Sequence, residues 1–148
     1  MLKPVTSEEQ EFFYRLFSDE AVMKWIGRPW TGEQLDSAWS QFLSNSESKL
    51  WLIQGSEKQA YGFVSLIKES REGSFQMGTV LKEAKQRKGL ATEVMSALMS
   101  FGKEHLNAKV INVRFKQEHL ASLNLVVKLG FSKFKECNKW QYWRKKLV

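Results

Sequence analysis

The spacing of apolar residues switches between two periods along this chain, and that alternation constrains the fold more than any other feature of the sequence. Near the start, apolar side chains recur every three to four residues, which predicts amphipathic helices over residues 7–18 and from residue 31 to about 42. Each stretch opens with a capping box, in which a threonine and a Glu or Gln three residues later satisfy backbone amides at the helix start. The two boxes are Thr6 with Glu9 and Thr31 with Gln34. A short helical turn, capped by Ser18 or Asp19 and ending near Trp25, is expected between the two helices.

The middle of the chain carries short β-rich runs instead. They cover residues 50–54, 61–68 and 75–81 and are separated by turn-forming residues, so we expect an antiparallel meander. The later segments are a helix over about 89–102, a strand over 110–115, a helix from about 120 to 129 that ends at Gly130, and two aromatic strands. This order predicts a mixed sheet with helices on its faces, which is the α/β (α+β) class.

Composition narrows the class of protein. With 43% hydrophobic and 26% charged residues, a chain of 148 residues can bury a core of its own, and its 2 prolines exclude a collagenous or linker-rich chain. The single cysteine, Cys137, allows no internal disulfide, and one thiol with two distant histidines offers no metal cage, so no metal is expected. No stretch approaches the roughly 18 apolar residues of a membrane span, and residues 1–10 lack the apolar region of a signal peptide. We therefore expect a soluble, cytoplasmic protein with no membrane partner.

Positive charge is concentrated in the C-terminal half. The net charge of +7 arises from 8 Lys and Arg against 11 Asp and Glu in residues 1–75, and from 15 against 5 in residues 76–148. Such an imbalance fits a polyanionic partner, whether nucleic acid, a membrane surface or a phosphate-rich small molecule. A solvated basic face explains the same numbers, so the charge alone does not choose between these readings.

One segment carries the chemistry of an anion site. The sequence Gln86-Arg87-Lys88-Gly89-Leu90-Ala91 lies where the third predicted strand leads into the third long helix. Small residues at positions 89 and 91 let a ligand approach the backbone, and the first amides of a helix have no partners within it. The helix dipole adds roughly half a positive charge at this end, and Lys85, Arg87 and Lys88 add cationic side chains. A pyrophosphate fits these features, although a glycine at a helix start is more often only a turn.

This loop resembles the Q/R-x-x-G-x-G/A loop of the GNAT superfamily of acyl-CoA-dependent N-acyltransferases. Downstream, Ala121-Ser122-Leu123 and Lys128-Leu129-Gly130-Phe131 are similar to the family's helix that flanks the pantetheine arm and ends in K-L-G-F. The opening, with Leu2-Lys3-Pro4 and residues 19–25, is similar to the branch that acetylates ribosomal-protein N-termini and related amines. The resemblance implies a single GNAT-like domain over residues 1–148, with a mixed, mostly antiparallel sheet of about six to seven strands, helices on both faces, and acetyl-CoA as the acyl donor.

The resemblance also implies which residues bind the cofactor. The loop and the first helical turn hold the pyrophosphate through backbone amides, and the end of the preceding strand hydrogen-bonds the pantetheine through its main chain. The implied cofactor-binding residues are Thr79, Val80, Leu81, Gln86, Arg87, Lys88, Gly89, Leu90, Ala91, Thr92 and His119. A β-bulge at the strand end would splay two strands, and a backbone N–H of Val80 or a neighbour would face the thioester carbonyl.

Three positions depart from the family pattern and limit the mechanism. Where family members often have Glu, Asn and Tyr, this chain has Gln76, His119 and Val126. Gln76 cannot act as a base and Val126 cannot protonate the departing thiolate, although a thiol with a pKa near 8.5 leaves tolerably well without help. The candidate catalytic residues are His119, as base or relay, and Ser122, as a hydrogen-bond donor to the thiolate. The plainer alternatives are a histidine satisfied at a helix start and a serine that only caps the helix.

The other candidates have simpler explanations. Cys137 has no nearby pattern of His and carboxylate residues that would indicate an activated nucleophile, so a covalent acyl-enzyme is not expected. Three tryptophans of the N-terminal helices, Trp25, Trp30 and Trp39, are candidates for an apolar wall of the acceptor pocket.

We predict an N-acetyltransferase that moves an acetyl group from acetyl-CoA directly to a primary amine, either a peptide N-terminus or a small amine. The missing Glu and Tyr leave a non-catalytic CoA-binding or sensor domain open as an alternative. The basic C-terminal half is the sole argument for a nucleic-acid-binding module. The protein is expected to be a monomer or a homodimer.

Overall fold

Seven strands form one sheet in the computed structural model, which describes residues 1–147. The strands are β1 (Leu2–Pro4), β2 (Ser48–Gln54), β3 (Ala60–Lys68), β4 (Ser74–Leu81), β5 (Val110–Lys116), β6 (Ser132–Cys137) and β7 (Trp140–Lys146). Their spatial order is β1-β2-β3-β4-β5-β7-β6. Strands β4 and β5 run parallel and the other neighbouring pairs run antiparallel, which confirms the predicted mixed, mostly antiparallel sheet.

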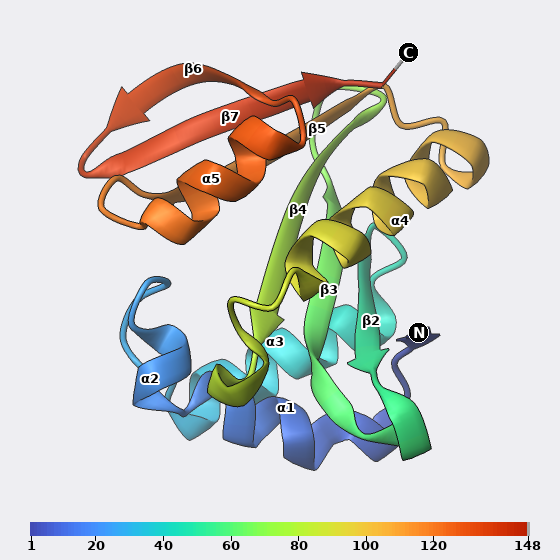
Figure 1. Ribbon diagram of the computed structural model, residues 1–148. Coiled ribbons are helices and arrows are strands. Elements are labelled where there is room, and N and C mark those ends of the chain that lie inside the picture. Colours follow the sequence, from blue (N-terminus) through green and yellow to red (C-terminus); the bar gives the residue numbers. More distant parts are fainter. Residues whose placement is uncertain (148) are drawn as a thin grey trace.

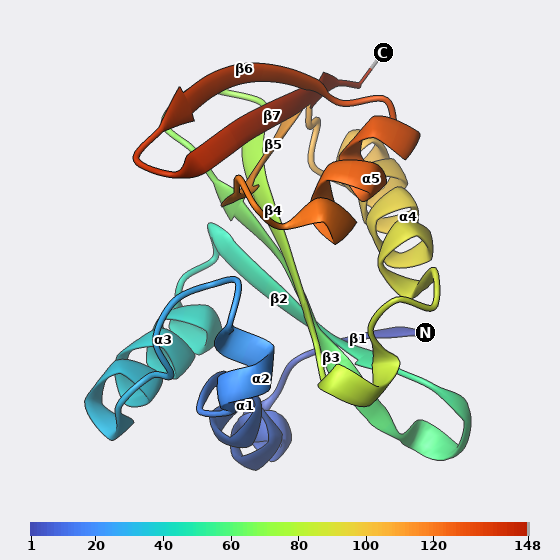
Figure 2. The ribbon, with the colours of Figure 1, turned by 60° about the vertical axis from the view of Figure 1, so that its left-hand side comes forward.

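Helices cover both faces of this sheet (Figures 1 and 2). They are α1 (Gln10–Phe17), α2 (Glu20–Met23), α3 (Gly32–Ser44), α4 (Leu90–His105) and α5 (Leu120–Lys128), with single 3₁₀ turns η1 (Ser7–Glu9), η2 (Ser56–Lys58) and η3 (Glu83–Lys85). The first three helices lie on one face, and α4 and α5 lie on the other. The α/β (α+β) class is therefore confirmed.

Two apolar cores result from this arrangement. Under α1 to α3, the fully buried Phe13 packs its ring against Phe17, Trp39 and Phe63. Under α4 and α5, the core is mainly aliphatic and includes Leu98 of α4, which is 1% exposed. Strand β4 contributes side chains to both cores, so its position is fixed from both sides.

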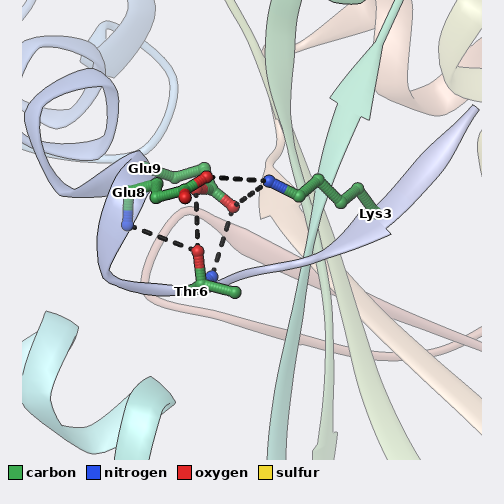
Figure 3. Close-up of polar contacts among 4 residues, drawn as sticks. All are labelled: Lys3, Thr6, Glu8 and Glu9. Carbon is green, nitrogen blue, oxygen red and sulfur yellow. Dashed lines mark hydrogen bonds and ion pairs between the residues drawn. The ribbon is translucent and has the colours of Figure 1, made fainter.

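A buried carboxylate joins the first strand to the first helical turn (Figure 3). The capping box predicted at Thr6 forms: the Thr6 amide and hydroxyl both donate to Glu9, at 3.2 Å each. Glu9 is 6% exposed, and its second partner is the ammonium of Lys3 at 3.2 Å. The hydrogen bond to Glu9 raises the pKa of Lys3 above its ordinary value. These contacts hold β1, a strand that the sequence pattern does not predict because it is three residues long and contains Pro4.

Strands β4 and β5 separate after a short paired section, and this separation creates the site. Their register runs only from Ser74–Val110 to Gln76–Asn112. Beyond Gln76, β4 continues along β3, whereas β5 continues along β7. The divergence confirms the splayed strands, but the expected β-bulge is wrong, because the register of β3 against β4 runs without a shift. The two strands separate instead because β4 stays paired with β3 whereas β5 stays paired with β7.

None of the helices in residues 1–147 combines the length and apolar character that a membrane crossing requires.

Candidate functional site

A cleft of about 810 Å³ opens between the separated ends of β4 and β5. The residues around it come from the end of α2, the second half of β4, the loop before α4 and its first turns, the end of β5, the length of α5 and the start of β7. Most of the sequence-predicted site residues line this cleft: Thr79, Val80, Leu81, Gln86, Arg87, Gly89, Ala91, Thr92, His119 and Ser122. Lys88 is exposed and lies outside the lining, and the side chain of Leu90 packs against the core under α4.

The loop before α4 is shaped to present backbone amides to the cleft. Gln86 fastens it to β4 by donating from Nε2 to the carbonyl oxygen of Leu81 at 3.0 Å. Arg87 and Gly89 are left-handed, with φ of 62° and 78°, and Gly89 caps α4 without any side-chain hydrogen bond. Glycine accepts this conformation at no steric cost, and a Cβ at Gly89 would meet nothing within 4 Å, so the space above it is open. The amides of the first helical turn therefore face an open region that suits an anion.

The main chain of β4 alternates between β3 and the cleft. The Lys82 amide donates to Tyr61 of β3, and the Ser74 carbonyl accepts from Glu69, so even-numbered residues of β4 direct their backbone groups towards β3. The odd-numbered residues Thr79 and Leu81 consequently direct theirs to the side that β5 has vacated. Of the three residues implied to bind pantetheine through their main chain, Val80 instead uses its backbone groups to pair with β3.

Thr79 gives a direct test of whether a polar cofactor fits. Its hydroxyl oxygen Oγ1 is buried and has no hydrogen-bond partner among the described residues. A buried hydroxyl without a partner costs free energy, and it lies in the wall of the cleft. Together with the open amides of α4, it is the kind of feature that a ligand with amide and phosphate groups would satisfy.

His119 lies between the two sides of the cleft. At the start of α5, its Nδ1 is 2.8 Å from the hydroxyl of Ser122, and its ring stacks on Trp25 with centroids 4.9 Å apart and planes 7° apart. Burial lowers the pKa of His119 below its ordinary value of 6.5, and the positive charge of Arg87 lowers it further. The imidazole is therefore mostly neutral at pH 7, and Nδ1 is the nitrogen that the Ser122 hydroxyl contacts. The two predicted catalytic residues are in contact with each other.

Other residues of the cleft were not identified from the sequence. Glu118 precedes His119 and is the one carboxylate among the described residues that line the cleft; Arg114 of β5 and Trp140 of β7 complete the same side. Glu118 had a local signal, a charge beside a helix start, whereas Arg114 and Trp140 meet only because β5 pairs with β7.

The expected acceptor wall of three tryptophans is only partly present. Trp25 lines the cleft. Gln76, the last residue of β4 that pairs with β5, lines it as well. Trp30 stacks on Phe17, with centroids 4.6 Å apart, and Trp39 is 4% exposed in the core under α1 to α3. The prediction is wrong for these two, because both side chains pack in that core, Trp30 from the loop before α3 and Trp39 from α3 itself.

In chemical terms, the cleft combines an end whose backbone amides suit an anion with the His119–Ser122 pair and an aromatic side formed by Trp25 and Trp140. No group of three or more His, Cys, Asp or Glu side chains in residues 1–147 gathers as metal ligands would. Cys137 is exposed at the end of β6 and does not line the cleft.

Comparison with known proteins identifies relatives over nearly the full length. Residues 1–132 match the model of the acetyltransferase (GNAT) domain family. The chain is 24% identical over 148 residues to the uncharacterized N-acetyltransferase YnaD of Bacillus subtilis (strain 168), which covers 95% of this chain and 87% of that protein.

Solved structures share the fold at low sequence identity. A domain from Methanocaldococcus jannaschii DSM 2661 has a TM-score of 0.87 and 17% identity, over 99% of this chain and 97% of that one. Spermidine N-acetyltransferase from Vibrio cholerae, solved in complex with CoA and spermine, has a TM-score of 0.84 and 16% identity, over 99% of this chain and 94% of that one.

Proposed function

Because the chain belongs to the acetyltransferase (GNAT) domain family and is an acyl-CoA-dependent N-acetyltransferase, we propose that its acceptor is the α-amine of a peptide N-terminus or a small amine of similarly low pKa. The same proposal groups this chain with the enzymes that acetylate ribosomal-protein N-termini.

Acetyl-CoA supplies the activated acetyl group, and this chain's residues would hold it along the cleft. The first-turn amides of α4, assisted by Arg87, suit the pyrophosphate. Thr79, through its unpaired hydroxyl and its cleft-facing main chain, suits the pantetheine amides. An amide of β4 that faces the cleft suits the carbonyl oxygen on which negative charge develops.

His119 and Ser122 are suited to the proton transfers. With the Nδ1 proton donated to the hydroxyl of Ser122, His119 keeps the lone pair of Nε2 free to accept a proton from the attacking amine. The lowered pKa keeps that nitrogen unprotonated at pH 7. Ser122, in the first turn of α5, can donate a hydrogen bond to the departing thiolate. Val126 is 2% exposed and has no proton to give, so the thiolate leaves with a hydrogen bond or with solvent alone.

The charges of the residues that line the cleft favour an acceptor with a single ammonium group. Among the described lining residues, Glu118 is the single carboxylate, whereas Arg87, Arg114 and Lys128 are cations. Lys24, whose ammonium lies 5.1 Å from the centre of the Trp25 ring, adds another positive charge near the acceptor side. One carboxylate matches an acceptor with one ammonium. A polyamine with several ammonium groups would meet mostly like charge.

The ionisation of the amine points the same way. Only the neutral amine attacks the thioester; with a pKa of about 7.8, an α-amine is roughly one-seventh neutral at pH 7, whereas a lysine at about 10.4 is neutral about once in 2,500. The difference corresponds to roughly 3.5 kcal/mol. A site with Gln76 and a weakly basic His119 is better matched to the α-amine, which is already partly deprotonated.

Spermidine is the second candidate, favoured by the fold shared with the Vibrio cholerae enzyme. A panel of acceptors distinguishes the two: a lysine-free peptide with a free N-terminus, the same peptide N-blocked with one lysine, and spermidine. With release of the CoA thiol as the readout at pH 7, the first peptide should be acetylated fastest. Faster turnover of spermidine would replace this proposal with the polyamine one.

A further inference from the structure

We infer that the sheet face formed by β5, β7 and β6 opposite α5 binds an acidic segment of the peptide whose N-terminus enters the cleft. This inference rests on the proposed function, because it names the class of peptide that the same site accepts.

The face is defined by the strand register. Directly paired residues share one side of a sheet, and alternate residues along a strand change sides. Arg114 pairs with Tyr142, which pairs with Lys135 of β6. The residues in between, such as Val113 and Phe115, are buried in the core that α5 covers. Figure 1 shows α5 along one side of the β6–β7 hairpin. Arg114 and its neighbours therefore lie on the opposite side of the sheet.

Five cations lie on this face, called here the cationic face: Arg114, Lys116, Lys135, Arg144 and Lys146. All except the half-buried Lys116 are exposed. Within residues 1–147, none of the five forms an ion pair with a carboxylate. Glu69, which reaches the neighbouring Asn112, is held by hydrogen bonds from Asn112 and Ser74. The face thus carries several positive charges without matching negative ones.

Three aromatic rings lie beneath these cations. The Arg114 guanidinium is 5.4 Å from the centre of the Trp140 ring, the Lys135 ammonium is 5.3 Å from Tyr142, and the Arg144 guanidinium is 4.6 Å from Phe134. Trp140 and Tyr142 are half-buried and Phe134 is 44% exposed, and each ring already has a cation over it, which a stacking nucleic-acid base would have to displace. Carboxylates, by contrast, would meet guanidinium and ammonium groups already held in place.

The cationic face is continuous with the cleft. Arg114 and Trp140 line both, and Lys116 reaches the end of α2 by donating to the carbonyl oxygen of Lys24 at 3.5 Å. From Trp140 to Arg144 the strand advances about 13 Å, which about four residues of extended peptide would span. A peptide with its α-amine at Glu118 and His119 would therefore lay its following residues across the cationic face. A second copy of this chain fits less well, since a symmetric pair would bring these five cations together.

The test compares two lysine-free peptides with free N-termini that differ only in having Glu or Gln at about positions four to eight. Since exposed ion pairs each contribute only modestly to binding, we expect kcat/KM for the Glu peptide to be about tenfold higher, through KM. The advantage should fall towards unity in about 0.5 M salt.

The variant for this test is Lys135→Gln with Arg144→Gln, neither of which lines the cleft. It should lose most of the advantage and leave the Gln peptide unchanged. The matched control is Lys133→Gln, on the same strand but on the α5 side, where Lys133 pairs with Trp143. Equal kcat/KM for the two peptides in wild-type protein would overturn the inference while leaving the proposed function intact.

Binding is measured separately by fluorescence anisotropy of the same peptides labelled at their C-termini. If neither peptide is acetylated but the Glu peptide still binds wild-type protein more tightly than the double variant, the proposed function fails, whereas the binding of an acidic peptide to the cationic face is retained. A single-stranded oligonucleotide that binds more tightly than the Glu peptide at about 0.15 M salt would overturn the inference and assign the face to nucleic acid.

Discussion

Gly89 is the residue on which the assigned cofactor site most depends, since its left-handed backbone turns the first amides of α4 towards open space. Gly89→Asp should abolish binding of acetyl-CoA, because a carboxylate at this position would repel the pyrophosphate and occupy its place. The measurement is calorimetric titration with CoA. Unchanged affinity for CoA in a folded Gly89→Asp protein would show that the start of α4 does not bind the pyrophosphate.

Gly89→Asn is the matched control. Asparagine has nearly the same shape as aspartate and tolerates the left-handed region similarly, so any backbone strain is shared by both variants. The Asn variant should keep a measurable affinity for CoA. Equal losses in the two variants would show that space or strain, rather than charge, decides the effect.

His119 gives a pH signature that a merely structural histidine would not. Its pKa is lowered from 6.5, mainly by burial, so the imidazole becomes protonated only below that value. With an α-amine acceptor of pKa about 7.8, log kcat/KM should fall with slope about 1 below that pKa, and with slope about 2 below the His119 pKa. His119→Gln should lower turnover more than CoA affinity and keep slope 1 throughout.

Ser122→Ala is the companion variant. Losing the one hydrogen bond to Nδ1 should cost about 1 kcal/mol, or about fivefold in turnover, which is less than the loss in His119→Gln. A wild-type profile that keeps slope 1 at every acidic pH at which the protein stays folded would mean that the proton leaves through water or Glu118.

Single residues were predictable where the signal was local. The spacing of His119 and Ser122 on one helical turn is visible in the sequence, and so is the glycine before α4. The stacking of Trp25 on His119 was not, since the two lie 94 positions apart and meet only through the packing of α2 near the mouth of the cleft.

At the scale of elements, the strand–loop–helix unit from β4 to α4 was predictable because each of its parts has a clear pattern. The predicted helix over 89–102 is one turn short, since α4 continues through His105. The strand β1 and the absence of a β-bulge were not predictable, because both depend on partners distant in sequence. Lys3 and Glu9 hold β1, and the separate partners β3 and β7 open the site.

The first capping box gives a prediction about stability. Thr6→Ala removes the hydroxyl that bonds both Glu9 and the Glu8 amide, and it leaves the buried Glu9 with fewer donors. It should lower the free energy of unfolding by about 1 kcal/mol, as losses of N-caps do. Urea denaturation measures the change, with Ser7→Ala as the neighbouring control. A loss confined to Ser7→Ala would contradict the role given to Thr6.

Across the whole molecule, the two cores place the cleft between a donor side and an acceptor side. Helices α4 and α5 form the side suited to CoA, and α2 with the ends of β5 and β7 forms the side suited to the amine. Sequence patterns predicted the side that we propose for the donor, because its residues lie in short contiguous motifs. The acceptor side combines residues from Trp25 to Trp140, so its charge became apparent only from the fold.

The central claim is that this acetyltransferase acts on α-amines, and one peptide that carries both a free N-terminus and a lysine tests it most directly. The two amines then compete at the same concentration in the same molecule. After partial reaction with acetyl-CoA at pH 7, fragmentation mass spectrometry locates the acetyl group. We expect the acetyl group on the N-terminal amine. Acetyl predominantly on the lysine would contradict it and would indicate a stronger base than His119.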